Sequence, residues 1–564
     1  MTRPSFRRLS AASSSAGSPP PETDVSWDVV ILGGSLAGAS AAVLLLRQQP
    51  DLRVLILERA PVFRRRVGEA TVEISGYFLG RVLGLTRHLN EHHLVKQGMR
   101  FWFQNGRTSN LADSSEIGGR YLVRLPAYQV DRAVLDEKVL ELAVSAGATV
   151  WRPASAARVD LRPGGLQSVT VRREDVALEV RARWVVDASG VGAVLARQEG
   201  WLEPNTRHPT SSAWARWEGV ADWDGRELAE RHPEWAAACP GIRGTATNHF
   251  MGDGWWAWCI PLKDGDVSVG VVFDERRVHW PETGSVGERL KAFLDRHPAA
   301  REILARARWK EGDVHWRRHL AYRSRVIAGD GFVVVGDAAG FIDPFYSPGM
   351  DWLAFTTFSG VDIVRRGLGG EELAPVLARH NATFGRSYDR WFEAVYENKY
   401  AYLGDFELMR LAFVLDLGLY YLGIVSQPFK RGDAALLQPV FSTGPSVPVF
   451  HLMRAYNRRL AAIAESRRAR GAFGRRNDRE RFLFGGFSLD PMSARPVISA
   501  LGRWLLLELT EGWRSWGRRR SGPVAAQPIP VAGAGKAPGV NPAPGPASAS
   551  NPGPAAGKTR GLAA

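Results

Sequence analysis

Residues 27–46 read WDVVILGGSLAGASAAVLLL, and this segment decides the fold. A short apolar strand over residues 27–32 runs into a tight turn, and an alanine-rich helix follows through Leu45. The turn consists of small residues, namely Gly33, Gly34, Ser35, Ala37 and Gly38. Glycines let the backbone approach a pyrophosphate closely, and the start of a helix attracts that negative charge. The segment therefore predicts a nucleotide-binding unit in an α/β fold.

A second strand and an acidic residue complete the pattern. The strand VLILE ends at Glu58, about twenty residues after the turn, where a carboxylate can meet a ribose hydroxyl. Ser35 stands where the fingerprint has its second glycine. A small side chain fits there if it points away from the phosphates. The order of strand, turn, helix, strand and acid predicts a dinucleotide site.

Three later segments indicate which dinucleotide binds. Residues 128–132 (YQVDR) open a helix, residues 184–190 (WVVDASG) form a strand that ends in a glycine turn, and FVVVGD ends at Asp337. This order resembles the flavoprotein monooxygenase superfamily, which builds its FAD site from scattered segments. The resemblance implies FAD as the cofactor. It places Arg132 and Asp337 near the phosphate and ribityl chain, with turns at Gly190 and Gly336.

Three motifs resemble one branch of that superfamily, the flavin-dependent halogenases. The string VGEAT contains Gly68, Glu69 and Ala70 and looks like their flavin strap, although Glu73 stands where many members have proline. The string WAWCIP, beginning at Trp256, fits their WxWxIP motif. The spacing FxxPxxSxG matches the loop that separates halogenases from hydroxylases. The flavin-side residues of this loop are Phe341, Pro344, Ser347, Pro348, Gly349 and Met350.

The resemblance assigns roles to these residues. Trp256 and Trp258 alternate on a strand, so they share one face and can keep the organic substrate away from the flavin. Lys96, in the setting KxGxxFxF, stands where the family carries the lysine that directs hypohalous acid to the substrate. This setting looks like that of the phenol- and pyrrole-directed members. Tyr346 replaces a glutamate of the tryptophan halogenases, which also favours a phenolic substrate.

The preferred hypothesis is thus a halogenase that uses reduced FAD, oxygen and chloride or bromide on a phenolic or other electron-rich aromatic molecule, free or tethered to a carrier protein. A separate flavin reductase would supply the reduced flavin. Proline has no N–H, so Pro348 removes one expected halide donor, and Asp351 places a carboxylate nearby. These two residues favour the alternative, an FAD-dependent monooxygenase or oxidoreductase that acts without halide. A third hypothesis is a non-enzymatic flavoprotein or membrane-associated scaffold.

The composition sets further expectations. The chain has 564 residues and a formal charge of +15, with arginine runs near both ends. We interpret most of this charge as solvated surface, and we expect no nucleic-acid binding because no recognition motif accompanies it. The two cysteines form no disulfide framework, which suits the cytoplasm. No histidine has metal-ligand spacing, so no metal is proposed.

The expected architecture is a three-layer, Rossmann-like FAD-binding fold with additions. The FAD-binding domain covers residues 25–200 and 325–370, and a mixed-sheet substrate layer covers 200–325. Within that layer, apolar runs at 254–262 and 266–273 on either side of a short turn predict two paired strands. A helical region follows over 370–520. It contains an apolar stretch at 411–425 and a basic, aromatic segment from Arg503 that suggests peripheral membrane contact. Residues 1–24 and 521–564 are expected to be a disordered arm and tail.

Overall fold

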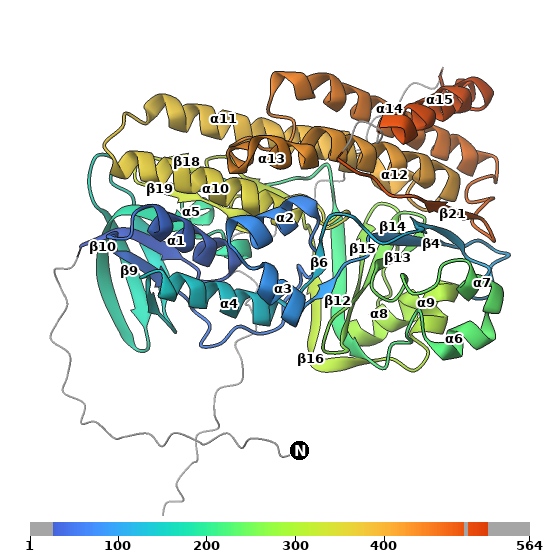
Figure 1. Cartoon of the computed structure of the whole chain (residues 1–564), viewed down its shortest axis with the longest axis horizontal. Coiled ribbons are helices and arrows are strands. Elements are labelled where there is room, and N and C mark those ends of the chain that lie inside the picture. The colour runs from blue at the N-terminus through green and yellow to red at the C-terminus, as the bar shows by residue number, and fades with distance from the viewer. Residues whose placement is uncertain (1–25, 490–493, 517–564) are drawn as a thin grey trace, which may run out of the picture. The chain divides into compact units, whose positions relative to one another are not determined.

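The computed structural model describes residues 26–489 and 494–516. The arm expected at 1–24 and the tail expected at 521–564 lie outside the described residues. Within them the α/β class is confirmed, since two eight-stranded sheets are combined with helices on their faces (Figure 1). A continuous apolar core links the first sheet to the helices that follow it in the chain.

The first sheet has the order β18-β19-β10-β1-β2-β7, extended by β9 and β8. Strands β19, β10, β1, β2 and β7 are parallel. Strands β2 and β19 and the C-terminal parts of β1 and β10 are buried, as expected for a sheet covered on both faces, whereas the edge strand β7 is partly exposed. The bounds are β1 Ser26–Leu32, β2 Val54–Leu57, β7 Thr149–Trp151, β8 Ser155–Asp160, β9 Gln167–Arg173, β10 Val176–Asp187, β18 Ala328–Gly329 and β19 Phe332–Val334. Helices α1 (Leu36–Gln48) and α4 (Arg132–Ser145) pack beside this sheet.

The second sheet has the order β16-β12-β15-β14-β13-β4-β5-β21. Its strands are β4 Met99–Phe103, β5 Ser115–Gly119, β12 Thr210–Glu218, β13 Thr247–Gly252, β14 Trp255–Pro261, β15 Val267–Asp274, β16 Arg308–Arg317 and β21 Arg481–Phe484. The hairpin expected from its apolar runs is present, since β14 and β15 pair antiparallel across residues 262–266. Helices α6 (Arg226–Arg231), α7 (Pro233–Ala237), α8 (Val286–Leu294) and α9 (Pro298–Ile303) belong to the same part of the fold (Figure 1).

Three strands do not follow the expected boundaries. Strands β4 and β5 fall within the 25–200 segment assigned to the FAD-binding domain, yet they hydrogen-bond into the second sheet. Strand β21 lies within the 370–520 region expected to be helical, and it pairs parallel with β5. In both cases a sheet edge offers unpaired backbone groups, and distant segments satisfy them.

The remaining C-terminal elements are helices that form a layer above both sheets (Figure 1, yellow to red). They are α10 Gly349–Leu368, α11 Ala374–Trp391, α12 Phe406–Tyr420, α13 Ser426–Arg431, α14 Val447–Ala469 and α15 Ala494–Thr510. Among the described residues, the continuous helical segment Phe406–Arg431 is the one long and apolar enough, by length and composition, to cross a membrane. Most of its apolar window (61%) is buried inside the protein.

Candidate active site

The glycine turn after β1 is shaped by close backbone packing. Gly33 has a φ of +100°, and a Cβ there would lie 2.6 Å from the carbonyl oxygen of Ala188. A Cβ on Gly38 would come within 1.9 Å of the oxygen of Gly33. Side chains are thus excluded at both positions, as the fingerprint requires. The turn leads directly into the start of α1, where a pyrophosphate can meet free N–H groups.

The departure at Ser35 has a structural explanation. Its hydroxyl faces Arg66, whose Nη1 lies 3.2 Å from Oγ. Glu58 braces the same turn from β2, because its Oε2 accepts the N–H of Gly34 at 2.8 Å and its Oε1 accepts the N–H of Ala60 at 2.8 Å. A carboxylate has about four acceptor sites, so Glu58 retains capacity for a ribose hydroxyl.

A charged cluster lies beyond the turn. Arg132 at the start of α4 donates to both oxygens of Asp136 (2.9 and 3.2 Å) and also contacts the flavin-strap region, since a Cβ on Gly68 would lie 2.8 Å from its Nη1. Burial raises the pKa of Asp337, while Arg132, Arg317 and Arg66 act to lower it. Three arginines around one carboxylate suit an anionic cofactor.

Two glycines with left-handed backbone belong to the predicted cofactor site. Gly190 has a φ of +62°, and no described atom lies within 4 Å of the position that its Cβ would take. Gly336 has a φ of +61° and donates its N–H to Thr356 at 2.8 Å. With the glycine turn, the arginines and the free start of α1, these residues fit FAD.

Glu69 is placed differently from the other strap residues. It is buried and ion-paired with Arg216 of β12, whose Nε donates to its Oε1 at 2.7 Å. Burial raises the pKa of Glu69 to about 7, against the opposing effect of Arg216. Ala70 forms an isolated β-bridge with Gln129. The Glu69 side chain therefore joins the strap to the second sheet, and its role in cofactor binding stays a prediction.

Lys96 lies on a large cavity beside the strap. The cavity has a volume of about 530 Å³ and is lined mainly by apolar and aromatic side chains of the strap, the 341–349 loop and the C-terminal helices. Lys96 is 2% exposed, and its Nζ donates to the carbonyl oxygen of Thr71 at 2.9 Å. Burial lowers the pKa of Lys96 to about 8, although Glu73 and Asp351 act to raise it. The lysine can therefore exchange a proton near neutral pH.

Two carboxylates that face this lysine were missed as functional residues. Asp351, in the first turn of α10, accepts the N–H of Ser75 at 2.9 Å and the hydroxyl of Tyr420 at 2.7 Å. Burial raises the pKa of Asp351 to about 7. Burial also raises the pKa of Glu73, whose Oε1 accepts the hydroxyl of Tyr421. The sequence signal was present, because both positions were noted as departures from the family, but only the fold brings them together.

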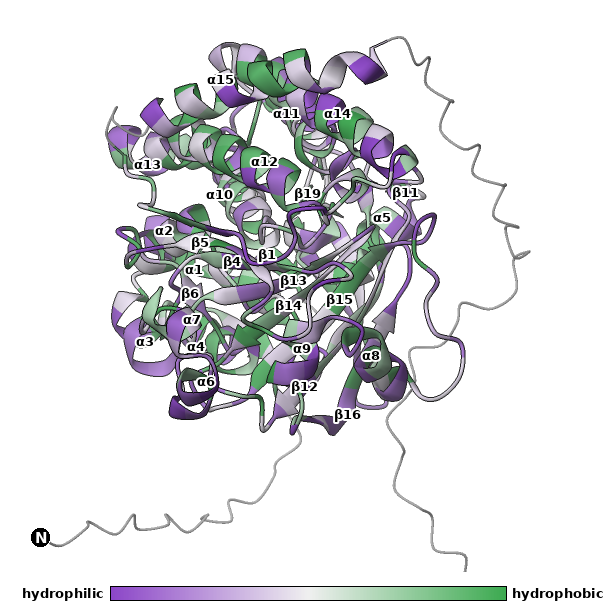
Figure 2. Ribbon diagram, turned by 90° about the vertical axis from the view of Figure 1, so that its right-hand side faces the viewer, coloured by the Kyte–Doolittle hydropathy of each residue, from purple (hydrophilic) through white to green (hydrophobic). Residues whose placement is uncertain are grey.

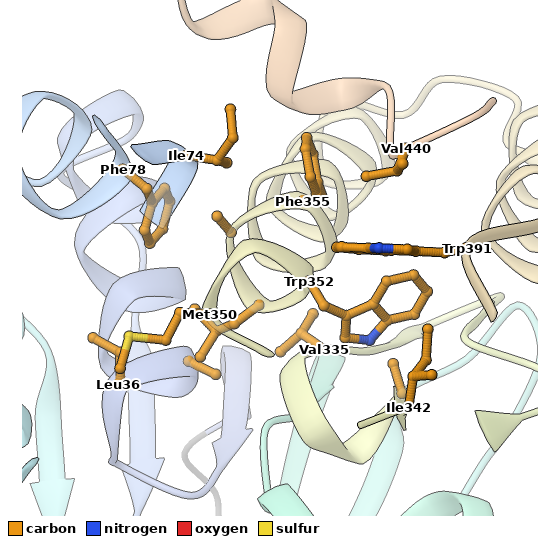
Figure 3. Packing of buried hydrophobic residues seen from close by; sticks show 14 of the residues in the cluster. Leu36, Ile74, Phe78, Val335, Ile342, Met350, Trp352, Phe355, Trp391 and Val440 are labelled. Carbon is orange, nitrogen blue, oxygen red and sulfur yellow. The ribbon is translucent and has the colours of Figure 1, made fainter. Parts of the chain in front are cut away.

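The 341–349 loop is held in an unusual conformation. Tyr346 and Ser347 have φ values of +69° and +58°, a left-handed region that side chains rarely adopt. The N–H of Ser347 donates to Pro344 at 2.9 Å, and Pro348 precedes the first residue of α10, Gly349. Met350 packs toward Leu36 at the start of α1, while Trp352 lies beside Ile342 (Figure 3). The loop thus joins the dinucleotide turn to the cavity.

Tyrosine hydroxyls of the C-terminal helices fix this loop. Tyr388 donates to the carbonyl oxygen of Phe341 and Tyr396 to that of Phe345, each at 3.1 Å. The phenol of Tyr346 itself donates to Asp416 of α12 at 3.1 Å. Asp416 also forms a buried ion pair with Lys399. The helical layer therefore holds the loop by directed hydrogen bonds.

The two tryptophans of β14 behave as expected from their alternation. Trp256 and Trp258 lie on one face, with ring centroids 5.9 Å apart. Trp256 packs against Phe345 of the loop (5.1 Å) and donates its Nε1–H to Tyr400 at 2.9 Å. Neither indole lines the cavity. They form a wall behind the loop, and their screening role stays a prediction.

Comparisons with known proteins agree with this arrangement. A family model described as FAD dependent oxidoreductase matches residues 28–250. Flavin-dependent halogenase chlA of Dictyostelium discoideum is 26% identical over 361 residues, which cover 58% of each chain. A chlorinase of 1H-pyrrole-2-carbonyl-peptidyl-carrier protein from Pseudomonas fluorescens is 26% identical over 350 residues, covering 58% of this chain and 73% of the relative.

A solved structure shares the fold. The crystal structure of halogenase PltM in complex with phloroglucinol and FAD superposes with a TM-score of 0.65. The match covers 85% of this chain and 96% of that one, at 19% identity. The shared fold includes the C-terminal region as well as both sheets, since so much of each chain is aligned.

Proposed function

We propose that this chain, which belongs to the flavin-dependent halogenase family of FAD-dependent oxidoreductases, halogenates a phenolic or similarly electron-rich aromatic substrate. The observation that carries the proposal is the position of Lys96, buried on an aromatic-lined cavity beside the FxxPxxSxG loop. FAD is the cofactor and, when bound and reduced, supplies the electrons that activate oxygen. The finer assignments below are proposals about the residues of this chain.

Lys96 is proposed to orient hypohalous acid. The protonated amine donates a hydrogen bond to the HOX oxygen and gives it a proton, so that this oxygen leaves as water when the halogen bonds to a ring carbon. The Glu73 and Asp351 pair takes the displaced ring proton and returns it to Lys96, so that ArH and HOX give ArX and water. A lysine whose pKa is about 8 keeps the amine largely protonated at neutral pH.

A phenolic substrate fits the polar groups of the cavity. Its walls are mostly apolar and aromatic, and Glu73, Asp351 and Tyr420 form one polar cluster among them. A phenol presents a flat apolar ring and one hydroxyl, which such a carboxyl cluster can hold. PltM was solved with phloroglucinol, a phenol. The pyrrole relative is named for a substrate bound to a carrier protein, so a carrier-bound aromatic is the second kind of substrate to test.

The halide is proposed to bind at the start of α10. Pro348 lacks an N–H, but the N–H groups in the first turn of a helix have no partner within the helix, and Gly349 and Met350 occupy that turn. Asp351 lies in the same turn, and its raised pKa together with two donors to its carboxylate reduces its repulsion of an anion. The loss of one donor at Pro348 is thereby offset by the helix.

The test is a reconstituted reaction. The purified protein is supplied with FAD, NADH, oxygen, bromide and a separate flavin reductase, which the proposal also requires. A panel of free phenols and a carrier-loaded aromatic are then analysed for bromine isotope doublets. Brominated phenols are expected. Hydroxylated products in their place would favour the alternative, an FAD-dependent oxidoreductase that acts without halide.

A matched pair of variants tests the lysine. Lys96→Met should keep FAD binding and NADH-driven oxygen consumption but give no brominated product. Lys138→Met, at a more exposed lysine on α4, is the control and should halogenate normally. Retained bromination by Lys96→Met would disprove the assigned role.

A further inference from the structure

Helix α15 presents an apolar stripe to solvent on its outer face. The stripe consists of Ile498, Leu505, Leu506 and Leu509 and continues onto Trp513 in the short 3-10 turn after the helix; these side chains are 52–69% exposed. The opposite face, with Val497 and Ala500 among its residues, packs on the protein. The helix is thus apolar on both sides and forms the outer edge of the C-terminal layer (Figures 1 and 2). Such a stripe typically marks an interaction surface.

A basic pocket borders this stripe. It has a volume of about 380 Å³ and lies between α12, β21 and α15. Four arginines line it, Arg410, Arg467, Arg476 and Arg503, while Phe482 and Leu507 contribute apolar surface. Arg503 lies on α15, on the flank between the pocket and the stripe.

The arginines are incompletely neutralised. Within residues 26–489 and 494–516, Arg410 and Arg503 form no ion pair or hydrogen bond. Burial lowers the pKa of Arg410, and the charge of Arg503 lowers it further, while Glu407 and Glu480 act to raise it. Glu407 is also near, but it already pairs with Arg467, Arg475 and Arg476. The pocket therefore has an excess of positive charge beside an apolar floor.

We propose that the outer face of α15 docks on an anionic phospholipid membrane. The apolar stripe would enter the headgroup and acyl boundary, while Arg410 and Arg503 would bind a headgroup phosphate. Exposed tryptophan and arginine side chains suit that boundary, because one has an amphipathic ring and the other a donor fork for phosphate. The proposal is independent of the reaction in the active site.

Charge favours a membrane over two other possible occupants of this surface, which are a second copy of the chain and the segment after residue 516. A second copy of the chain would bring the same arginines against each other. The sequence after residue 516 contains six lysine and arginine residues and no aspartate or glutamate, so it offers no carboxylate to the pocket. Those basic residues would add to the attraction for an anionic surface.

The experiment uses the full-length, FAD-loaded protein with vesicles. Flotation is compared for vesicles of phosphatidylcholine alone and of phosphatidylcholine with about one third phosphatidylglycerol, at low and high salt. The wild type should float with the anionic vesicles and be released by salt. Equal flotation with both vesicle types would overturn the proposal.

Variants separate the two elements of the surface. Leu505→Ser with Leu509→Ser removes the centre of the stripe, and Arg503→Gln removes one cation; each should weaken apparent affinity at least ten-fold. Val176→Ser and Arg162→Gln, at exposed positions on the first sheet, are the matched controls and should bind as the wild type does. All variants should bind FAD normally, which reports folding.

Two further outcomes would contradict the membrane assignment. If light scattering shows a dimer that Leu505→Ser with Leu509→Ser disrupts, the stripe is an interface between copies of this chain. If inorganic phosphate at matched ionic strength displaces the protein from vesicles while the leucine variants still bind, the pocket takes a free anion and the stripe has no part in docking.

Discussion

Replacing Lys96 with methionine should stabilise the protein at neutral pH, and the gain should shrink as the pH rises. The folded-state pKa of Lys96 is about 8, against an ordinary value of 10.5. Below pH 8 the folded protein must hold a buried cation that the unfolded chain exposes to water. Between pH 8 and 10.5 the unfolded chain binds more protons than the folded one, so the stability of the wild type rises with pH.

The size of the effect follows from the difference between the folded-state pKa of about 8 and the ordinary value of 10.5. At about 1.36 kcal/mol per pH unit, the buried cation costs roughly 3 kcal/mol at pH 7, falling to roughly 1 kcal/mol at pH 9.5. Methionine removes this cost at every pH. The variant also loses the hydrogen bond to Thr71, at about 1 kcal/mol, which is independent of pH. The pH-dependent difference of roughly 2 kcal/mol is therefore the diagnostic quantity.

The assay is denaturant unfolding of wild type and Lys96→Met at pH 7 and pH 9.5. Without the cation, the pKa values of Glu73 and Asp351 should rise, which lowers the stability of the variant at high pH. This change also makes the stability gain of Lys96→Met shrink as the pH rises. Lys138→Met is the control, because its partly exposed amine should give no comparable difference. A stability difference between Lys96→Met and wild type that is equal at both pH values would refute the assigned burial of charge.

Three other substitutions test the neighbouring groups. Glu73→Gln removes a carboxylate that raises the pKa of Lys96, so the alkaline limb of the halogenation profile should move down by roughly one pH unit, measured from initial rates across pH 6–9. Asp416→Asn leaves the buried Lys399 without its counterion and should cost about 3–5 kcal/mol, measured by denaturant unfolding; an unchanged midpoint would contradict the ion pair. Pro348→Ala restores one N–H and should lower the KM for bromide by about ten-fold, in line with a hydrogen bond to a charged group; an unchanged KM would place the halide elsewhere.

Local patterns in the sequence were sufficient for much of the fold. The turn from Gly33 to Gly38 and the acid Glu58 lie within one βαβ unit, so their spacing alone fixed their geometry. The hairpin of β14 and β15 was also local, since an apolar run on each side of a short turn specifies antiparallel pairing. These features depend on neighbours in the chain, which is why a single sequence reveals them.

The acid–base groups of the cavity could not be predicted in this way. Ser75 and Asp351 are separated by 276 positions, yet they share a hydrogen bond. In the sequence, Glu73 was noted only because it stands where many family members have proline, and Asp351 only as a charge near the halide. Their joint effect on Lys96 depends on the packing of α10 and α12 against the strap, which no local spacing encodes. The pairing of β21 with β5 was missed for the same reason.

The loop that suggested halogenation also shows why the C-terminal helices belong to the site. Two consecutive left-handed residues, Tyr346 and Ser347, cost about 1–3 kcal/mol each and persist only where surrounding contacts hold them. The hydroxyls of Tyr388 and Tyr396, together with Asp416, supply those contacts from the helical layer.

This strain gives Pro348 a role. After two left-handed residues the chain must return to helical geometry, and proline fixes φ near the required value, here −76°. Proline lacks an N–H, but at a helix start the backbone N–H groups have no intrahelical partner in any case. The proline therefore sets the direction in which Gly349 and Met350, the proposed halide donors, point their N–H groups. A residue that removes one donor thus orients the next two, and the lower KM expected for Pro348→Ala requires that the regained donor outweighs the loss of this orientation.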